Sequence, residues 1–283
     1  MRPPGVAVIA GLGSLPLQLA DALQQEGRRY IVCAPHGLEV ASFERCERFR
    51  YSHLFSFLAG LRLRNYRQLV MAGKFHRPGA EELADVEPAS RPLAPAILPS
   101  LRQGDDTALR RIRAVIEGFG LQVCGIPEVA PALVPGAGVL GSVSPCGADR
   151  LDAQRAAAIV ATLSEVDIGQ ACVVSQGQCL ATEALFGTDV MLEWVAGSRH
   201  RLPAAAQGRS GVLYKAPKRQ QDRRLDLPAI GPDTVAHAAR AGLAGIAWEA
   251  DGVIVVERAA TVAAADAAGL FLWSCDPAFS LPR

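Results

Sequence analysis

The chain has 283 residues, of which half are hydrophobic and a fifth are charged, and its formal net charge is +1. Such a chain is long enough for two ordinary domains, and its composition excludes an intrinsically disordered protein. The near-zero net charge excludes nucleic-acid binding driven by a broadly basic surface, and no apolar run reaches the roughly 20 residues of a membrane span. The short, glycine-broken apolar segment near the N-terminus is typical of a first strand and not of a signal peptide.

The first 130 residues predict a Rossmann-like α/β domain with a parallel sheet. An apolar strand at residues 6–10 runs into a glycine turn at residues 11–14, a leucine-periodic helix follows, and a second strand covers residues 30–34. This order favours parallel strands joined by helical crossovers. Glycines at such a turn let a phosphate or sugar approach the N–H groups at the helix start, although a tight turn can also need glycine for packing alone.

The same turn is a poor dinucleotide fingerprint. Pro16 stands where the third glycine of GxGxxG is expected, and the second strand ends in Pro35 and His36 with no acid that could hold a ribose. A general anion or sugar pocket is therefore favoured here over an NAD site.

Two further polar groups follow elements of this domain. A strand at residues 69–73 delivers Lys74, His76 and Arg77 to the edge where open α/β sheets bind ligands. Asp105 and Asp106, after Gly104, open a helix, and paired acids in that position are most often N-caps.

Residues 131–141, rich in proline and glycine, predict a linker before a C-terminal mixed α/β domain at residues 142–283. The pattern in this domain predicts a helix at 149–164, a hairpin at 171–183, and a helix capped by Thr188 or Asp189. A helix capped by Asp233 or Thr234, a hairpin through Asp251-Gly252 and a last helix at 259–268 follow, and the final apolar stretch at 270–273 is expected to be packed.

The seven cysteines include no CxxC pair, and the five histidines form no ligand motif. Their number and surroundings favour reduced, mostly buried thiols of a cytosolic protein and make a zinc site improbable.

The stretch at residues 211–234 combines lysines and arginines with alternating carboxylates. The run could be a solvated face. However, a buried strand leads into it, Pro228 and Gly231 fix its exit as a turn, and in an extended chain Asp222, Arg224 and Asp226 would share one face. Cations that hold phosphates beside acids that hold a divalent metal indicate phosphoryl chemistry.

Together these motifs resemble the metal-dependent UDP-2,3-diacylglucosamine pyrophosphatases of lipid A biosynthesis. The resemblance extends over nearly the whole chain and rests on GLGSLP at 11–16, Lys74 with Arg77-Pro78, Gly104-Asp105-Asp106, DIGQ at 167–170, Glu183, Gly187-Thr188-Asp189 and QDxRxDLPxIG within 215–234. It implies two α/β domains with the substrate between them. It also implies hydrolysis of UDP-2,3-diacylglucosamine to UMP and 2,3-diacylglucosamine 1-phosphate (lipid X), with water attacking the sugar-side phosphorus and Mg2+ or another divalent metal as cofactor.

Residue types and spacing, together with that resemblance, indicate which residues form the active site. Magnesium takes one or two protein carboxylates, and pyrophosphate cleavage depends mainly on positioning and electrostatics. We expect Asp226, Asp222 and Lys215 to be catalytic, with Asp226 and Asp222 as metal ligands and Asp226 the essential one. The expected substrate-binding residues are Gly11, Gly13, Ser14, Lys74, Gln170, Thr188, Asp189, Lys218 and Arg224.

Two other functions stay open on the residues alone: an NAD(P)- or nucleotide-sugar-binding Rossmann enzyme, and a non-catalytic lipid or nucleotide sensor. For the pyrophosphatase, the expected partner is the lipid-linked UDP-sugar and no nucleic acid, and the sequence allows a homodimer. The expected location is the cytoplasm, with at most peripheral contact to the inner membrane.

Overall fold

The computed structural model describes residues 3–40, 43–75, 78–79, 81–83, 85–93, 105–202 and 209–276, with the side chains of residues 105–108 left out. The chain divides into two compact units. Unit 1 comprises Met1–Pro131 together with Asp222–Asp226, and unit 2 comprises Ala132–Gln221 and Leu227–Arg283. The predicted catalytic stretch is thus divided, because five of its central residues belong to the N-terminal unit.

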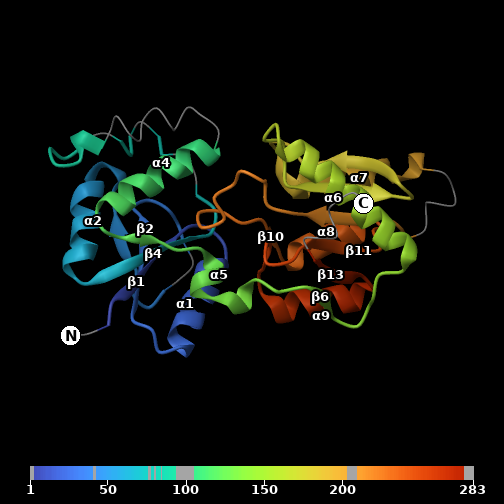
Figure 1. Ribbon diagram of the computed structural model, residues 1–283, viewed down its shortest axis with the longest axis horizontal. Helices are drawn as coiled ribbons and strands as arrows, with labels where there is room; N and C mark the ends of the chain where they lie inside the picture. The colour runs from blue at the N-terminus through green and yellow to red at the C-terminus, as the bar shows by residue number, and fades with distance from the viewer. Residues whose placement is uncertain are drawn as a thin grey trace. The chain divides into compact units, whose positions relative to one another are not determined.

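Unit 1 is built on a five-stranded, wholly parallel sheet with the strand order β3-β2-β1-β4-β5 (Figure 1). Every residue of the central strand β1 is buried, as expected for a strand covered on both faces. The strands are β1 Gly5–Ala10, β2 Tyr30–Pro35, β3 Glu47–Phe49, β4 Tyr66–Ala72 and β5 Gln122–Val123. The Rossmann-like prediction for this part of the chain is confirmed.

Helices cover both faces of this sheet. Apolar residues of α2 and α4 pack with β1, β4 and β5 in one hydrophobic cluster, while α1 and α5 lie together against β1 and β4 on the other face. The helices are α1 Leu15–Gln25, α2 Leu54–Leu63, α4 Asp105–Gly118 and α5 Ile126–Val129.

Unit 2 contains a six-stranded mixed sheet with the order β6-β13-β11-β9-β7-β8. Strands β9, β11 and β13 are parallel, whereas β6, β7 and β8 each pair antiparallel with a neighbour. A separate two-stranded sheet pairs β10 with β12. The strands are β6 Gly138–Leu140, β7 Ala171–Ser175, β8 Gln178–Thr182, β9 Val212–Lys215, β10 Ala229–Ile230, β11 Gly245–Glu249, β12 Ile254–Val255 and β13 Phe271–Cys275.

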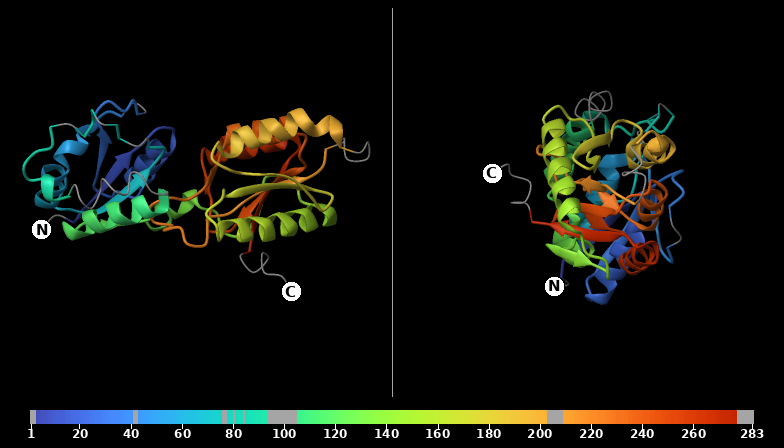
Figure 2. Two further views of the ribbon diagram at one scale, coloured as in Figure 1. Left: turned by 90° about the horizontal axis from the view of Figure 1, so that it is seen from above. Right: turned by 90° about the vertical axis from the view of Figure 1, so that its right-hand side faces the viewer.

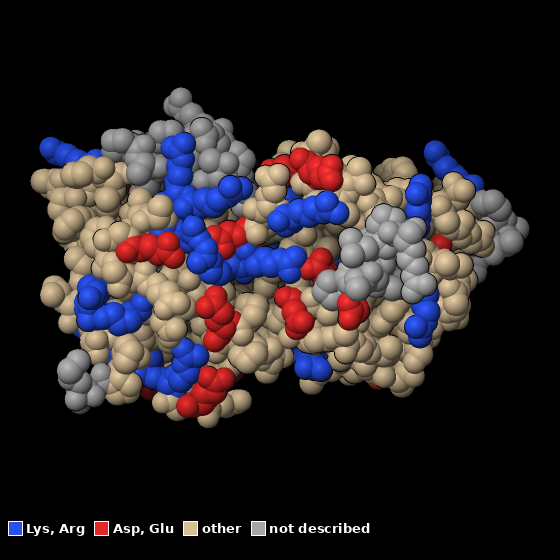
Figure 3. All heavy atoms as spheres, in the orientation of Figure 1, with Lys and Arg blue, Asp and Glu red and all other residues tan. Residues whose placement is uncertain are grey.

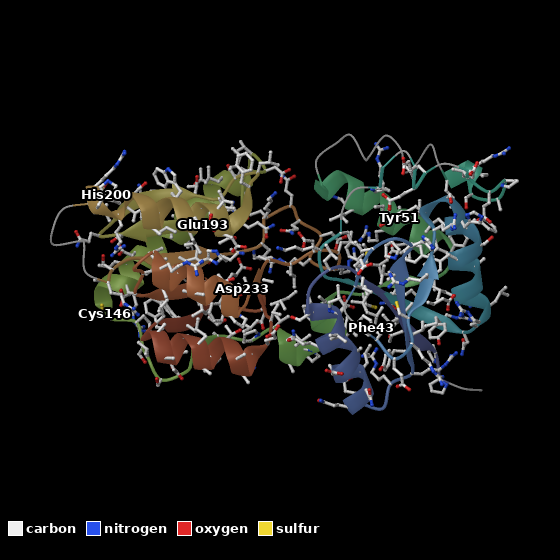
Figure 4. The ribbon with its side chains drawn as sticks, turned by 180° about the vertical axis from the view of Figure 1, so that it is seen from behind. Phe43, Tyr51, Cys146, Glu193, His200 and Asp233 are labelled. Atoms are coloured by element: carbon white, nitrogen blue, oxygen red, sulfur yellow. The ribbon has the colours of Figure 1, made fainter. Side chains whose placement is uncertain are left out.

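One long helix covers one face of this sheet, and three helices cover the other (Figure 2). The single helix α6 (Gly147–Ser164) packs its alanines on Cys172, Val212 and Tyr214. On the other face, α7 and α8 lie side by side, and Nε2 of His237 on α8 is 3.4 Å from Oε1 of Glu193, which Figure 4 labels on α7. These helices are α7 Gly187–Ser198, α8 Pro232–Arg240 and α9 Arg258–Ala268.

Three local predictions for unit 2 differ from the structure. Asp251-Gly252 does not join a hairpin, because β11 pairs with β9 and β13 while β12 pairs with β10. Within the predicted linker at 131–141, β6 is an edge strand on β13. Asp233 and Thr234 do not cap α8, because its N-cap is Gly231 and both residues lie in its first turn. By contrast, the apolar stretch near residue 270 is packed as expected, in the strand β13 next to β11.

The surface agrees with the near-zero net charge. On the face drawn in Figure 3, basic and acidic side chains are interspersed. In the described part of the chain, no helix combines the length and the apolar character needed to cross a bilayer.

Candidate active site

The glycine turn of unit 1 follows the carboxyl end of β1. At this point the strand order changes direction, because β2 pairs with one side of β1 and β4 pairs with the other. Open α/β sheets bind ligands at such a switch point. The turn is tied to the end of β4: Leu12 N donates to Lys74 O at 2.8 Å, and Lys74 N donates to Leu12 O at 3.0 Å. A Cβ on Gly11 would stand 2.6 Å from Lys74 O, so close backbone packing explains that glycine.

Gly13 and Ser14 continue this turn differently. Gly13 has a φ of +97° with nothing within 4 Å of an added Cβ, so the backbone conformation and not packing selects glycine. Ser14 occupies the N-cap of α1, but its side chain makes no capping hydrogen bond. Its Oγ instead accepts from Nε2 of Gln18 at 3.3 Å.

Asp222 is held on unit 1 by two arginines. Its Oδ2 lies 2.9 Å from Nη1 of Arg113 on α4, and its carboxylate accepts from Nε and Nη2 of Arg224 at 3.0 and 3.1 Å. Nη1 of Arg224 also lies 3.9 Å from Oε1 of Glu117 on α4. Arg224, which we predicted to bind substrate, therefore makes a bidentate contact with Asp222, and a phosphate bound at Arg224 would have to share its guanidinium group.

Leu225 anchors the same segment by its apolar side chain. It is 7% exposed and packs in the hydrophobic cluster formed by α2, α4 and the sheet. The backbone of Arg224 passes so close to Gly125, just after β5, that a Cβ there would stand 3.2 Å from the Cα of Arg224. Because parallel strands end at one edge of the sheet, the segment lies at the same edge as the glycine turn and Lys74.

Asp226 closes this anchored turn and is exposed to solvent. The N–H groups of Leu225 and Asp226 both donate to Asp222 O, at 2.9 and 3.3 Å. The carboxylate that we predicted to be essential thus lies on a short turn. The ion pair of Asp222 and the buried side chain of Leu225 fix this turn to unit 1.

Lys215 is a buried cation of unit 2. It is the last residue of β9 and is only 7% exposed, so its ammonium group needs hydrogen-bond partners. Its Nζ donates to Thr188 Oγ1 at 2.9 Å and to Ala229 O at 3.0 Å. Thr188 Oγ1 in turn donates to Oε2 of Glu183 at 3.2 Å, so the ammonium and the carboxylate are connected through one hydroxyl.

Thr188 and Asp189 lie in the first turn of α7 and do not cap it. Gly187, with a φ of +83°, begins the helix, and the N-cap is Phe186, so that prediction is wrong. Thr188 is buried toward Lys215, whereas Asp189 is exposed.

Gln170 lies beside Lys215, because Ala171 is the register partner of Lys215. Gly169 has a φ of +55°, and an added Cβ would overlap Glu183 O, so the preceding backbone is fixed. Within the described structure, Oε1 of Gln170 is buried and has no hydrogen-bond partner. A buried acceptor of this kind suits a ligand that brings a hydroxyl or amide N–H.

Lys218 forms an ion pair with Asp167. Its Nζ lies 2.6 Å from Oδ1 of Asp167, the first residue of the DIGQ motif, so a phosphate at Lys218 would compete with that carboxylate.

The predicted residues therefore gather at two sheet edges. Unit 1 brings together Gly11, Gly13, Ser14, Lys74, Asp222, Arg224 and Asp226, and unit 2 brings together Gln170, Lys215, Thr188 and Asp189, with Lys218 paired to the adjoining Asp167. His76, Arg77, Gly104 and the side chains of Asp105 and Asp106 lie outside the described residues. No group of three His, Cys, Asp or Glu placed to hold a metal is found in the described part of the chain.

Sequence reasoning missed the residues that hold the site in place. The sequence spacing of Arg113 and Glu117 is that of an ordinary i,i+4 ion pair on a solvated helix face. Leu225 and Gly125 belong to no recognisable local motif. Glu183 was noted only as part of the resemblance.

Both halves of the chain match models of known protein families. Residues 5–133 match the family model described as the LpxI N-terminal domain, and residues 136–273 match that of the LpxI C-terminal domain. The UDP-2,3-diacylglucosamine pyrophosphatase LpxI of Caulobacter vibrioides is 37% identical over 281 residues, covering 96% of this chain and 98% of that protein. The chain therefore belongs to the LpxI family.

Proposed function

We propose that this protein hydrolyses the pyrophosphate bond of UDP-2,3-diacylglucosamine to UMP and 2,3-diacylglucosamine 1-phosphate, a step of lipid A biosynthesis. Family membership and the full-length similarity to a pyrophosphatase support this reaction. The structural observation that carries it is the presentation of Asp226 on an anchored, solvent-facing turn at the ligand-binding edge of unit 1.

In the proposed reaction, the oxygen of a water molecule bonds to the sugar-side phosphorus, and the bond from that phosphorus to the UMP oxygen breaks. Asp226 orients the attacking water or binds the metal. Asp222 holds this turn through its arginines. Lys215 places a buried positive charge for the phosphate oxygens, where the low dielectric strengthens it. That one substrate contacts residues of both units stays a prediction.

A divalent metal such as Mg2+ fits the residues of unit 1 only in part. Magnesium commonly takes one or two protein carboxylates and completes its shell with waters and substrate phosphates. Asp226 is exposed at the turn, where waters and substrate phosphates could complete the coordination shell of a metal. The oxygens of Asp222 face Arg113 and Arg224. We therefore propose Asp226 as the main metal ligand, with Asp222 beside it. When bound, the metal would offset the negative charge of the pyrophosphate.

The substrate carries two acyl chains, and the protein is proposed to meet it in the cytoplasm by peripheral contact with a membrane. An exposed apolar face supports this contact: Leu185, Phe186, Val190 and Trp194 are 93%, 79%, 49% and 59% exposed. The last three are spaced four residues apart and so share one side of α7. Large apolar side chains exposed in a row along one helix favour an interaction surface.

The test is UMP release from purified protein supplied with UDP-2,3-diacylglucosamine, with EDTA and with added Mg2+. Asp226→Asn, which keeps the shape and removes the charge, is expected to abolish release while the protein unfolds at the same temperature. Asp233→Asn is the matched control, because Asp233 is another exposed aspartate, on α8 (Figure 4). Near-normal turnover by Asp226→Asn would refute the assignment of Asp226, and no UMP from the wild type would refute the function.

The two alternative functions give different results in the same assays. An NAD-binding Rossmann enzyme would be stabilised against heat by NAD, which the pyrophosphatase should not bind. A sensor would bind the lipid without releasing UMP and without dependence on a metal.

A further inference from the structure

Two cysteine sulfurs lie in contact on the edge hairpin of unit 2. Sγ of Cys172 on β7 is 3.7 Å from Sγ of Cys179 on β8. All seven cysteines are free thiols, and the other five are Cys33, Cys46, Cys124, Cys146 and Cys275. The closeness of this pair has no evident part in phosphoryl chemistry.

A β-bulge is what brings the two thiols to one face of the hairpin. Val173 pairs with Ala181, but the next pair is Val174 with Cys179, so Leu180 is the extra residue. Paired residues point to the same face and alternate residues share a face, so Cys179 lies on the face of Val174 and Cys172. Without the bulge, the one-residue shift would place Cys179 on the opposite face.

The hairpin is also held in place from outside. Its two-residue turn, Gln176-Gly177, has positive φ at both positions, the conformation that matches the twist of paired strands. The N–H groups of Gln176 and Gly177 donate to the two carboxylate oxygens of Asp152 on α6, at 2.9 and 2.7 Å. Because Asp152 is itself buried, this contact fixes the turn and so limits how far the two strands can slide apart.

The two thiols differ in access and in chemistry. Cys172 is fully buried, and burial raises its pKa far above the usual value, with a smaller opposing effect of Arg155. Cys179 is exposed on the edge strand, where a small oxidant can reach it. An accessible thiol beside a protected one is the arrangement of a reacting and a resolving cysteine.

We propose that Cys172 and Cys179 form a redox-modifiable dithiol that peroxides convert into an intramolecular disulfide. The Cys179 sulfur attacks the peroxide, the O–O bond breaks, and Cys179 becomes a sulfenic acid while one water leaves. The Cys172 sulfur then displaces the sulfenic oxygen as a second water, and the S–S bond forms. Both thiols together lose two electrons and two protons, and a dithiol reductant reverses the change.

The experiment treats the full-length protein with hydrogen peroxide, alkylates the remaining thiols, and maps the peptides by mass spectrometry with and without dithiothreitol. We expect a cross-linked pair of peptides containing Cys172 and Cys179, a mass loss of about 2 Da from the removal of two hydrogens, and full recovery of both thiols on reduction. The link should form before Cys146, the exposed cysteine at the start of α6 (Figure 4), is oxidised.

Three variants make the result decisive. Cys179→Ser should abolish the link and leave Cys172 reduced, whereas Cys146→Ser should change neither. Cys172→Ala, which removes only the buried sulfur, should let Cys179 proceed to sulfinic acid because no resolving thiol is present; circular dichroism checks that it folds. Oxidation of Cys179 in the wild type without linkage to Cys172, or linkage of Cys179 between two molecules, would overturn the proposal.

Discussion

The Asp222 carboxylate lies 2.9 Å from Nη1 of Arg113, and this ion pair joins a helix of the N-terminal unit to a segment that arrives from the other half of the chain. Asp222 is 13% exposed and Arg113 25%, so the contact is shielded more than a surface salt bridge. The pair stabilises unit 1 and also fixes the turn that presents Asp226.

Arg113→Ala should therefore affect both stability and turnover. Hydrogen bonds to charged groups contribute about 1.5–3 kcal/mol, so the free energy of unfolding should fall by about that amount or less, because Arg224 remains on Asp222. UMP release should also slow, since the turn is less firmly held. Urea unfolding and a kinetic assay measure the two effects. Arg111→Ala on the same helix is the control, and equal behaviour of the two variants would contradict the role of Arg113.

Leu225→Ala tests the apolar anchor of the same turn. Truncating a buried leucine generally lowers the free energy of unfolding by about 2–5 kcal/mol. Here we expect the turn to detach locally before the rest of unit 1 unfolds. Backbone amides at residues 222–226 should exchange hydrogen much faster while β1 and β4 stay protected, as followed by hydrogen-exchange mass spectrometry. Leu185→Ala removes an exposed leucine instead and should leave that exchange unchanged. Uniform acceleration across unit 1 would show that Leu225 supports the whole core instead.

Lys215→Met separates charge from packing. A methionine of similar length removes the cost of desolvating a buried ammonium group but leaves Thr188 Oγ1 and Ala229 O without its hydrogen bonds, so the thermal stability should fall moderately while the fold is kept. Removing one preorganised charge-stabilising group typically slows catalysis by roughly 10²–10³-fold, and we expect kcat to fall by that factor. Thr188→Val, which removes the hydroxyl between Lys215 and Glu183, should have a smaller effect. A Lys215→Met variant that turns over normally would exclude Lys215 from the reaction.

The elements that could be predicted are those with a local signature. The buried strand, glycine turn and leucine-periodic helix at residues 6–25 follow one another with no distant partner needed, and the parallel sheet of unit 1 followed from them. The helix at 147–164 and the hairpin at 171–182 were likewise visible as a run of alanines and a tight turn. The likeness of the ordered motifs to a known family supplied the reaction itself.

What could not be predicted depends on contacts between distant residues. Nothing near Leu225 in the sequence shows that it belongs to the same hydrophobic cluster as Ile116 and Leu121, so the placement of Asp222–Asp226 in unit 1 could not be predicted. The turn at Asp251-Gly252 was correctly placed, but local residues do not choose strand partners. Pairing of β12 with β10 removed the expected hairpin.

Burial of Cys33 and Cys275 makes stability fall in alkali. Burial raises the pKa of each thiol from 9.0 to about 12. Because the folded-state pKa is the higher one, the unfolded chain loses these protons first, and stability is lost as the pH rises from 9 toward 12. Each thiol should contribute at most about 1.4 kcal/mol per pH unit in that window. Urea unfolding at pH 8 and pH 10 should show a smaller drop for Cys33→Ala than for the wild type, and an unchanged drop for the exposed-site control Cys146→Ser.

The apolar side of α7 should bind lipid bilayers without spanning them. Burying one large apolar side chain contributes about 1.5–3 kcal/mol, so Phe186→Ser or Trp194→Ser should each weaken binding by roughly tenfold or more. Cosedimentation with vesicles containing anionic lipid measures the loss, and wild-type Trp194 fluorescence should shift to the blue as the ring leaves water. Leu63→Ser is the matched control, because Leu63 is 87% exposed but lies on α2 of unit 1. If Leu63→Ser weakens vesicle binding as much as Phe186→Ser does, exposed apolar area in general and not this face of α7 is responsible.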